Sequence, residues 1–200
     1  MWVITVLSAG QVVLGGGAIL AVVGRNTGAQ AVSTAPSARP QVTETDPAKD
    51  VFQVDDDSSL VGLSIGGDQI GVAGDSVTGF ILRDLEVSDA AKSGLYLSGI
   101  NSGTISGNTA TLNDEGFYVK WFHSGTMIGN MATSNSSHGF LVGGQYGNGF
   151  KPNYFTASNT ATFESNISSD NIGQGYDIEG MPKTGSGPNF GHRNASNDSF

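Results

Sequence analysis

The sequence has no cysteine, which excludes disulfide bonds and thiolate metal sites. Basic side chains are also scarce, because nine lysines and arginines stand against 18 aspartates and glutamates, a formal charge of −9. This charge disfavours nucleic acid and anionic membrane surfaces as partners, and it opposes capture of an acidic polysaccharide unless a cation mediates. Glycine, by contrast, is abundant, with 30 of 200 residues, and a hydrophobic content of 38% is enough for the core of one domain.

The N-terminal segment differs from the rest of the chain. No charged side chain precedes Arg25, and the small residues AQA at positions 29–31 form a candidate cleavage site. We therefore expect residues 1–31 to be a signal peptide or, alternatively, a membrane anchor. A misplaced start codon or a folded strand pair is the third possibility. Residues 32–50 combine proline, serine, threonine and charge without periodicity, so we expect a linker there. The folded domain is expected over residues 51–200.

Beyond Val51 the chain repeats a template of glycine, a large apolar residue, a variable residue and an aliphatic residue. The template appears as GFIL, GLYL, GFYV, GFLV and GYDI, starting at Gly79, Gly94, Gly116, Gly139 and Gly175. Turn residues recur in a second register, at Asp84, Asn108, Asn130 and Asn166. Short strands joined by glycine and asparagine turns are typical of β-solenoids. We predict an all-β fold, a single-stranded right-handed parallel β-helix with coils of about 22–24 residues.

The apolar template positions predict the core. The first and third residues after each glycine point the same way in a strand, which predicts two stacked rows: Phe80, Leu95, Phe117, Phe140, Tyr176 and Leu82, Leu97, Val119, Val142, Ile178. A third predicted row contains Ile81, Ile105, Met127 and Phe163. The asparagine row is interpreted as structural, since asparagine tolerates a left-handed corner and can bond to its equivalent one coil away. Because Asn194 occupies the turn position of a further coil, we expect the solenoid to be incomplete at its C-terminus.

The second and fourth positions of the template are expected on the outer face of one sheet. They carry the candidate ligand-binding residues Tyr96, Tyr118, Lys120, Asp177 and Glu179. Tyrosine rings can bind sugar faces, and a lysine beside them can neutralise a carboxylate. Lys151, in GNGFK, joins this row if Gly149 begins a coil of its own. Only ten residues separate Gly139 from Gly149, so a loop at Lys151 is the alternative.

The repeated coils resemble the right-handed parallel β-helix superfamily, which includes pectate lyases, polysaccharide epimerases and NosD-like carbohydrate-binding proteins. The resemblance covers residues 58–200. More narrowly, NDEGFYVKW, SSHGFLV and GNGFK, in this order, resemble the family nine polysaccharide lyases. That resemblance implies β-elimination at a uronate, with Lys151 as the base that abstracts the proton next to the carboxylate. It also implies calcium, which stabilises the transition state in that family.

The calcium positions depart from the pattern of the family. Where it has aspartates, this chain has Glu115, Ser137, His138 and Leu141. Calcium takes six to eight oxygen ligands, which one glutamate and one serine cannot supply. Glu115 remains as the metal candidate, and Lys120 is an alternative group for neutralising the uronate.

Three further sets of side chains suggest alternatives. His123 ends a predicted strand and is interpreted as structural. Trp121 and Phe122 are candidates for a sugar platform. A glycosidase would instead use Asp170, Asp177 and Glu179 as its carboxylates.

Taken together, these features predict an exported monomer, secreted or at the cell surface, that acts on an acidic or otherwise extended polysaccharide. The leading hypothesis is a pectate-lyase-like β-elimination, and the alternative is a non-catalytic carbohydrate-binding or cell-surface β-helix protein. A structural repeat or stalk is the third. Nucleic acid is not expected as a partner, nor is a membrane beyond the N-terminal anchor.

Overall fold

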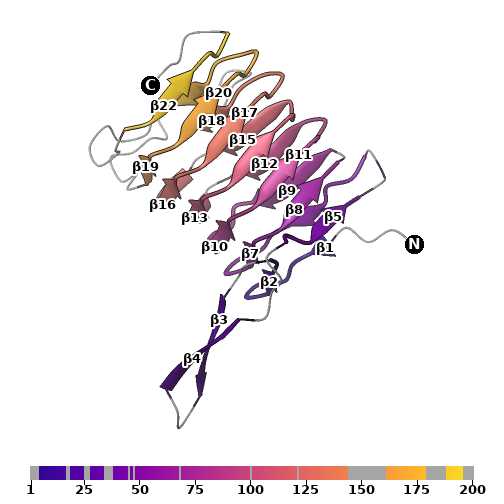
Figure 1. Ribbon diagram of the computed structural model, residues 1–200, viewed down its shortest axis with the longest axis vertical. Helices are drawn as coiled ribbons and strands as arrows, with labels where there is room; N and C mark the ends of the chain where they lie inside the picture. Colours follow the sequence, from indigo (N-terminus) through magenta and orange to yellow (C-terminus); the bar gives the residue numbers. More distant parts are fainter. Residues whose placement is uncertain are drawn as a thin grey trace.

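The computed structural model describes residues 5–16, 19–24, 28–33, 38–44, 46, 48–67, 69–99, 101–120, 122–143, 161–178 and 188–195. Over these residues the regular structure is entirely β-strand, and most strands lie in three parallel sheets that the chain visits in turn (Figure 1). Sheet I contains β1 (Thr5–Val6), β6 (Phe52–Gln53), β9 (Ile70–Asp75), β12 (Ser93–Ser98), β15 (Glu115–Lys120), β18 (Phe140–Gly143) and β21 (Tyr176–Ile178).

Sheets II and III complete each coil. Sheet II contains β2 (Val12–Leu14), β7 (Ser59–Val61), β10 (Thr78–Arg83), β13 (Asn101–Ser106), β16 (Phe122–Ile128) and β19 (Thr162–Glu164). Sheet III contains β5 (Gln41–Thr43), β8 (Ser64–Gly66), β11 (Glu86–Ser88), β14 (Thr109–Thr111), β17 (Met131–Thr133), β20 (Ile167–Ser169) and β22 (Phe190–His192). The predicted all-β parallel solenoid is confirmed.

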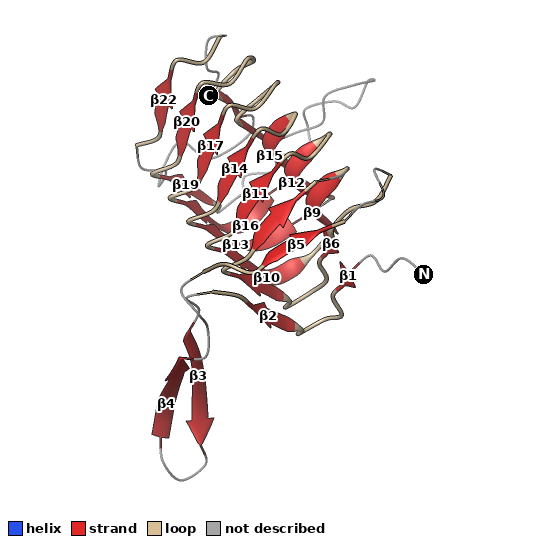
Figure 2. Cartoon of the chain, turned by 45° about the vertical axis from the view of Figure 1, so that its right-hand side comes forward, coloured by secondary structure: helices blue, strands red, loops and turns tan. Residues whose placement is uncertain are grey.

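The N-terminal residues also contribute strands to this stack. β1, β2 and β5 pair in parallel with β6, β7 and β8. Between β2 and β5 the chain forms an antiparallel hairpin of β3 (Ile19–Gly24) and β4 (Gly28–Ser33), which projects from the solenoid (Figure 2). The described residues contain no helix with the length and apolar character needed to span a membrane. The division into export segment, linker and domain stays a prediction.

The core rows of sheet I follow the prediction from the second repeat onward. Leu95 pairs with Phe117, Phe117 with Phe140 and Phe140 with Tyr176, and all four side chains are fully buried. The rings of Phe117 and Phe140 stack at 4.7 Å between centroids, and those of Phe140 and Tyr176 at 5.2 Å. Stacked aromatic side chains thus fill this end of the core.

The placement of the first repeat, GFIL, was wrong. Phe80 and Leu82 are buried, but they lie in β10 of sheet II, where Leu82 pairs with Ile105. Ile81, expected in the core, points outward and is 37% exposed. The true neighbour of Leu95 in the preceding coil is Val72 of β9. A period-two pattern is the same in all three sheets, so it cannot tell which sheet a strand joins.

Two asparagine ladders turn the chain at two corners of each coil. At the corner between sheets II and III, side-chain amides join Asn108 to Asn130, Asn130 to Asn166 and Asn166 to Asn189, at 3.0, 2.9 and 3.0 Å. The second ladder, between sheets III and I, contains Asn113, Asn135, Asn171 and Asn194. The structural role predicted for the first ladder is confirmed, whereas the second had not been recognised from the sequence.

Asp84 does not belong to the first ladder. The residue that donates its backbone N–H to Asn108 is Leu85, at 3.0 Å. Asp84 stands one position earlier, with a φ of 54°, and Gly107 and Gly129 take the same left-handed conformation just before Asn108 and Asn130. Aspartate is among the few non-glycine residues that tolerate this backbone, which explains its presence there.

Candidate functional site

The outer face of sheet I brings the two predicted tyrosines together. Tyr96 of β12 pairs with Tyr118 of β15, and the same row continues through Leu141 to Asp177. The tyrosine rings meet edge to face, with centroids 5.2 Å apart and planes at 81°. Both side chains are partly exposed, so they form an aromatic surface open to solvent. The register expected for this row is confirmed.

Lys120, the last residue of β15, lies against both rings. Its Nζ donates a hydrogen bond to the hydroxyl of Tyr96 at 3.0 Å. The same Nζ lies 5.2 Å from the ring centre of Tyr96 and 4.9 Å from that of Tyr118. Cation–π contacts of this length stabilise an ammonium group. We name Tyr96, Tyr118 and Lys120 the tyrosine–lysine cluster.

The cluster favours the charged form of Lys120. Partial burial is the largest single influence and by itself lowers the pKa of Lys120, but the hydrogen bond to Tyr96 and the electrostatic effects of both tyrosines outweigh it. The pKa of Lys120 is therefore raised above its usual range. A lysine that stays protonated is a cationic binding group and a poor proton acceptor.

Asn101 positions the end of the lysine strand and is a residue that the sequence analysis missed. Its buried Nδ2 lies 3.0 Å from the carbonyl oxygen of Lys120, 3.0 Å from that of Ser98 and 2.7 Å from that of Gly99. Its Oδ1 accepts the backbone N–H of Val77 at 3.1 Å. The signal in the sequence was slight, because Asn101 stands outside the two repeating asparagine registers.

The other predicted binding residues are not all gathered at the cluster. Asp177 lies in the same row but two strands beyond Tyr118, and it is 4% exposed. Asp170, the other described carboxylate of the glycosidase alternative, forms an ion pair with Arg193 at 2.7 Å. The catalytic candidate Lys151 lies outside the described residues, as do Glu179 and Trp121, and so does the side chain of His123.

The metal candidates do not form a site among the described residues. An oxygen of Glu115 accepts a hydrogen bond from the Ser93 hydroxyl at 2.9 Å. The hydroxyl of Ser137 and Nδ1 of His138 are paired with each other at 2.9 Å, and Leu141 adds only an apolar side chain to the tyrosine row. No group of three histidine, cysteine, aspartate or glutamate side chains comes together in the described part of the chain. The calcium site implied by the lyase resemblance is therefore not supported.

Comparisons with known proteins agree on the fold. The family model described as "Periplasmic copper-binding protein (NosD)" matches residues 55–190. A comparison with curated proteins gave no match. Among solved structures, that of the periplasmic alginate epimerase AlgG is similar, with a TM-score of 0.53 and 15% identity. The match covers 76% of this chain and 38% of that chain, so it spans well under half of that structure and indicates a shared fold.

The copper in the description of that family can be tested against the side chains present. Copper in proteins prefers imidazole and sulfur ligands. The chain has three histidines and no cysteine, and Nδ1 of His138 is engaged by Ser137. Since no three histidine, cysteine, aspartate or glutamate side chains come together among the described residues, these residues form no copper centre built from such ligands.

Proposed function

The chain belongs to the NosD family of periplasmic proteins, and from this membership we propose that it is an exported β-helix protein that binds an acidic polysaccharide across the outer face of sheet I. The observation that carries the proposal is the position of Lys120 against Tyr96 and Tyr118. The similar solved structure is named as an alginate epimerase, and this name supports an acidic polysaccharide as the ligand proposed for this chain.

The tyrosine–lysine cluster matches a uronate in two ways. The partly exposed rings offer apolar faces on which a sugar can lie. The ammonium group of Lys120 offers a charge-assisted hydrogen bond to the carboxylate of that sugar, and its raised pKa keeps the charge in place. In a protein with a formal charge of −9, this local cation supplies the attraction that the molecule as a whole lacks.

Binding is tested by measuring the affinity for oligogalacturonates and oligoalginates by calorimetry. We expect Lys120→Met to lose at least about tenfold in affinity, because about 1.4 kcal/mol of charge-assisted bonding is removed. The matched control is Lys92→Met. Lys92 is exposed and immediately precedes Ser93, the first residue of β12, so this variant removes a positive charge outside the cluster. Equal losses in the two variants would indicate general electrostatics and would contradict a role for the cluster.

A catalytic form of the same proposal is β-elimination at the bound uronate. In this reaction Lys151, uncharged, takes the proton next to the carboxylate while Lys120 pairs with that carboxylate. A carbon–carbon double bond then forms, the glycosidic C–O bond breaks, and the leaving oxygen takes a proton from water. The supporting observation is that Lys120 pairs with Gly143, the residue at which the chain leaves β18 for the segment that carries Lys151.

Catalysis is distinguished from binding by the ultraviolet absorbance of unsaturated uronate products. We expect product from the wild type, and a loss of at least about a hundredfold in Lys151→Ala with binding retained, since general base catalysis contributes about this much. Lys49→Ala is the control for removing a lysine elsewhere. If the protein binds a polymer but releases no product from any of them, only the non-catalytic form of the proposal remains. If it neither binds nor releases product, the whole proposal is contradicted.

A further inference from the structure

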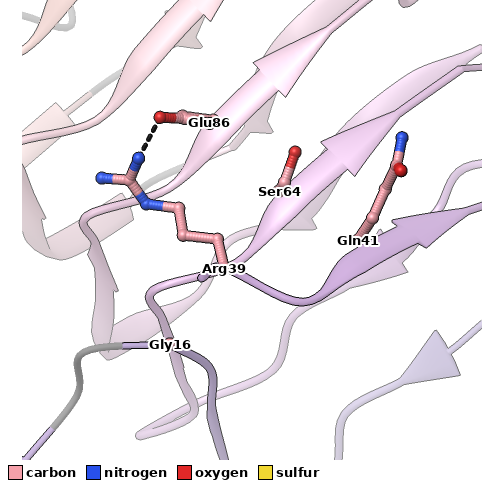
Figure 3. Close-up of a pocket in the computed structure, with 5 residues that line it drawn as sticks. All are labelled: Gly16, Arg39, Gln41, Ser64 and Glu86. Carbon is pink, nitrogen blue, oxygen red and sulfur yellow. Dashed lines mark hydrogen bonds and ion pairs between the residues drawn. The ribbon is translucent and has the colours of Figure 1, made fainter. Parts of the chain in front are cut away.

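A polar pocket of about 600 Å³ lies on a different face of the molecule, the outer face of sheet III. It is lined by Gly16, Arg39, Gln41, Ser64 and Glu86 (Figure 3). Three of these residues begin neighbouring strands, since Gln41 of β5 pairs with Ser64 of β8, and Ser64 pairs with Glu86 of β11. Their side chains therefore form a row with a spacing of about 4.8 Å, the distance between adjacent strands.

In the full chain, with residues 1–31 retained, the insertion of the hairpin β3–β4 brings Arg39 to this row. Gly16 precedes the hairpin and Arg39 follows it, so the two residues mark its base. A Cβ on Gly16 would lie 2.1 Å from the carbonyl oxygen of Ala38 and 2.8 Å from the backbone nitrogen of Arg39. Only a residue without a side chain allows this approach, and the approach sets the arginine beside the strands.

The charges in the pocket are balanced and fixed by contacts. One terminal nitrogen of Arg39 contacts the carboxylate of Glu86. The Nε of Arg39 donates a hydrogen bond to the backbone carbonyl of Asp84 at 3.1 Å. The side chains of Arg39 and Glu86 keep 35% and 51% of their surface exposed, so both retain atoms that a ligand can reach. Arginine only donates, carboxylate only accepts, and the amide of Gln41 and the hydroxyl of Ser64 do both.

This chemistry selects one class of ligand. An anion would meet the carboxylate of Glu86 and a chain of net charge −9, while a cation would meet Arg39. An apolar ligand would bury the polar groups of the lining without giving them partners. A neutral polyhydroxylated molecule satisfies both donors and acceptors, because each of its hydroxyl groups donates and accepts.

We propose that the pocket formed by Arg39, Gln41, Ser64 and Glu86 is a binding site for a neutral sugar, separate from the acidic-polysaccharide face of sheet I. The row of polar side chains offers several hydrogen-bonding groups to the hydroxyl groups of a saccharide. The site does not depend on the tyrosine–lysine cluster, because the two lie on different sheets. The protein therefore has two carbohydrate-binding surfaces of different charge preference.

The test is a titration of the full chain with neutral hexasaccharides of glucose, mannose and galactose. NMR and calorimetry measure the binding. Free monosaccharides form a second arm, which separates a single-sugar site from one that needs a chain. We expect binding that is reduced at least tenfold by Ser64→Phe, which fills the pocket, and severalfold by Gln41→Ala. The second variant truncates an exposed side chain, so the fold is retained even if the larger residue perturbs it.

Two controls make the result specific. Met131→Phe adds the same aromatic ring at the same strand position of sheet III, two strands beyond Glu86, and should leave binding unchanged. Lys120→Met should also leave neutral-sugar binding unchanged. The proposal is overturned if no neutral saccharide binds, if Ser64→Phe and Gln41→Ala bind like the wild type, or if only uronates shift the signals of the pocket residues.

Discussion

At the residue scale, the ladder asparagines from Asn108 to Asn171 are buried polar groups whose bonds run between coils. Asn130 accepts from the backbone N–H and the side-chain amide of Asn108, and its own Nδ2 donates to the carbonyl of Ile105 and to the side chain of Asn166. It has no exposed surface. Removing it leaves several buried groups without partners, which costs more than the bonds themselves contribute.

We therefore expect Asn130→Ala to lower the free energy of unfolding by about 3 kcal/mol. Urea denaturation followed by circular dichroism measures this change. The control is Gln53→Ala, which truncates an exposed amide on the outer face of sheet I and should change stability by less than about 0.5 kcal/mol. A loss for Asn130→Ala as small as that of the control would show that the ladder contributes little.

The raised pKa of Lys120 predicts how acidic-ligand binding depends on pH. A lysine with a raised pKa keeps its proton further into the alkaline range than an isolated lysine, so binding is lost only as the pH rises through that raised pKa. Affinity for a uronate oligosaccharide should therefore agree within about twofold at about pH 7 and about pH 9. A tenfold fall across this interval would identify a different titrating group as the binding cation.

At the scale of elements, glycines set the contact between neighbouring strands of sheet I. A Cβ on Gly94 would lie 2.8 Å from the carbonyl oxygen of Gly116, and a Cβ on Gly116 would lie 2.6 Å from that of Gly139. Both positions start the repeated template, so the recurrence of glycine at the start of the template has a steric cause. Gly71, rather than Gly79, begins this series, since its Cβ would meet the oxygen of Gly94 at 2.7 Å.

We expect Gly116→Ala to destabilise the protein by about 2 kcal/mol, because the added methyl group is forced against backbone. Gly129→Ala is the informative comparison. Gly129 has a φ of 64° and open space around its Cβ, so alanine there meets only backbone strain of about 1 kcal/mol. Thermal unfolding of both variants measures the difference, and a smaller loss for Gly116→Ala than for Gly129→Ala would contradict steric contact as the cause.

Among the described residues, no asparagine ladder runs along the corner between sheets I and II, and in this the corner differs from the other two. Along the first asparagine ladder, one coil advances by 22 residues from Asn108 to Asn130 and another by 23 residues from Asn166 to Asn189. The coil that contains residues 144–160 advances by 36 residues from Asn130 to Asn166. In the sequence, the extra residues lie between Gly143, which ends β18 and pairs with Lys120, and Thr162, which begins β19.

At the scale of the whole molecule, the negative charge opposes the approach of an acidic polymer even though Lys120 attracts its carboxylates. Salt screens the long-range repulsion, whereas the short contact at the cluster is screened less. We expect the association rate with polyuronate to rise severalfold between about 10 and 150 mM salt, as measured by stopped-flow fluorescence. A neutral hexasaccharide is the control, and a rate that falls with salt for the polyuronate would indicate attraction instead.

Much of this architecture could be predicted because its causes are local in the chain. Alternating apolar residues define strands, asparagine and glycine define corners, and Tyr96 and Tyr118 share an outward row because strand periodicity requires it. The prediction failed at two positions. Phe80 fits the template of sheet I but lies in sheet II, and Asp84 stands one residue before the ladder position, which Leu85 occupies. Pattern alone does not distinguish one corner of a solenoid from the next.

The fold class and the composition of the outer row of sheet I can be inferred from the sequence, since both follow from repeats within a few residues. The sites depend on which coils stack on which, because that brings distant residues into contact. Lys120 contacts Tyr96 across 24 residues of sequence, and Arg39 contacts Glu86 across 47 residues. Such pairings arise from strand register and from glycine-dependent close approach, which no local pattern specifies.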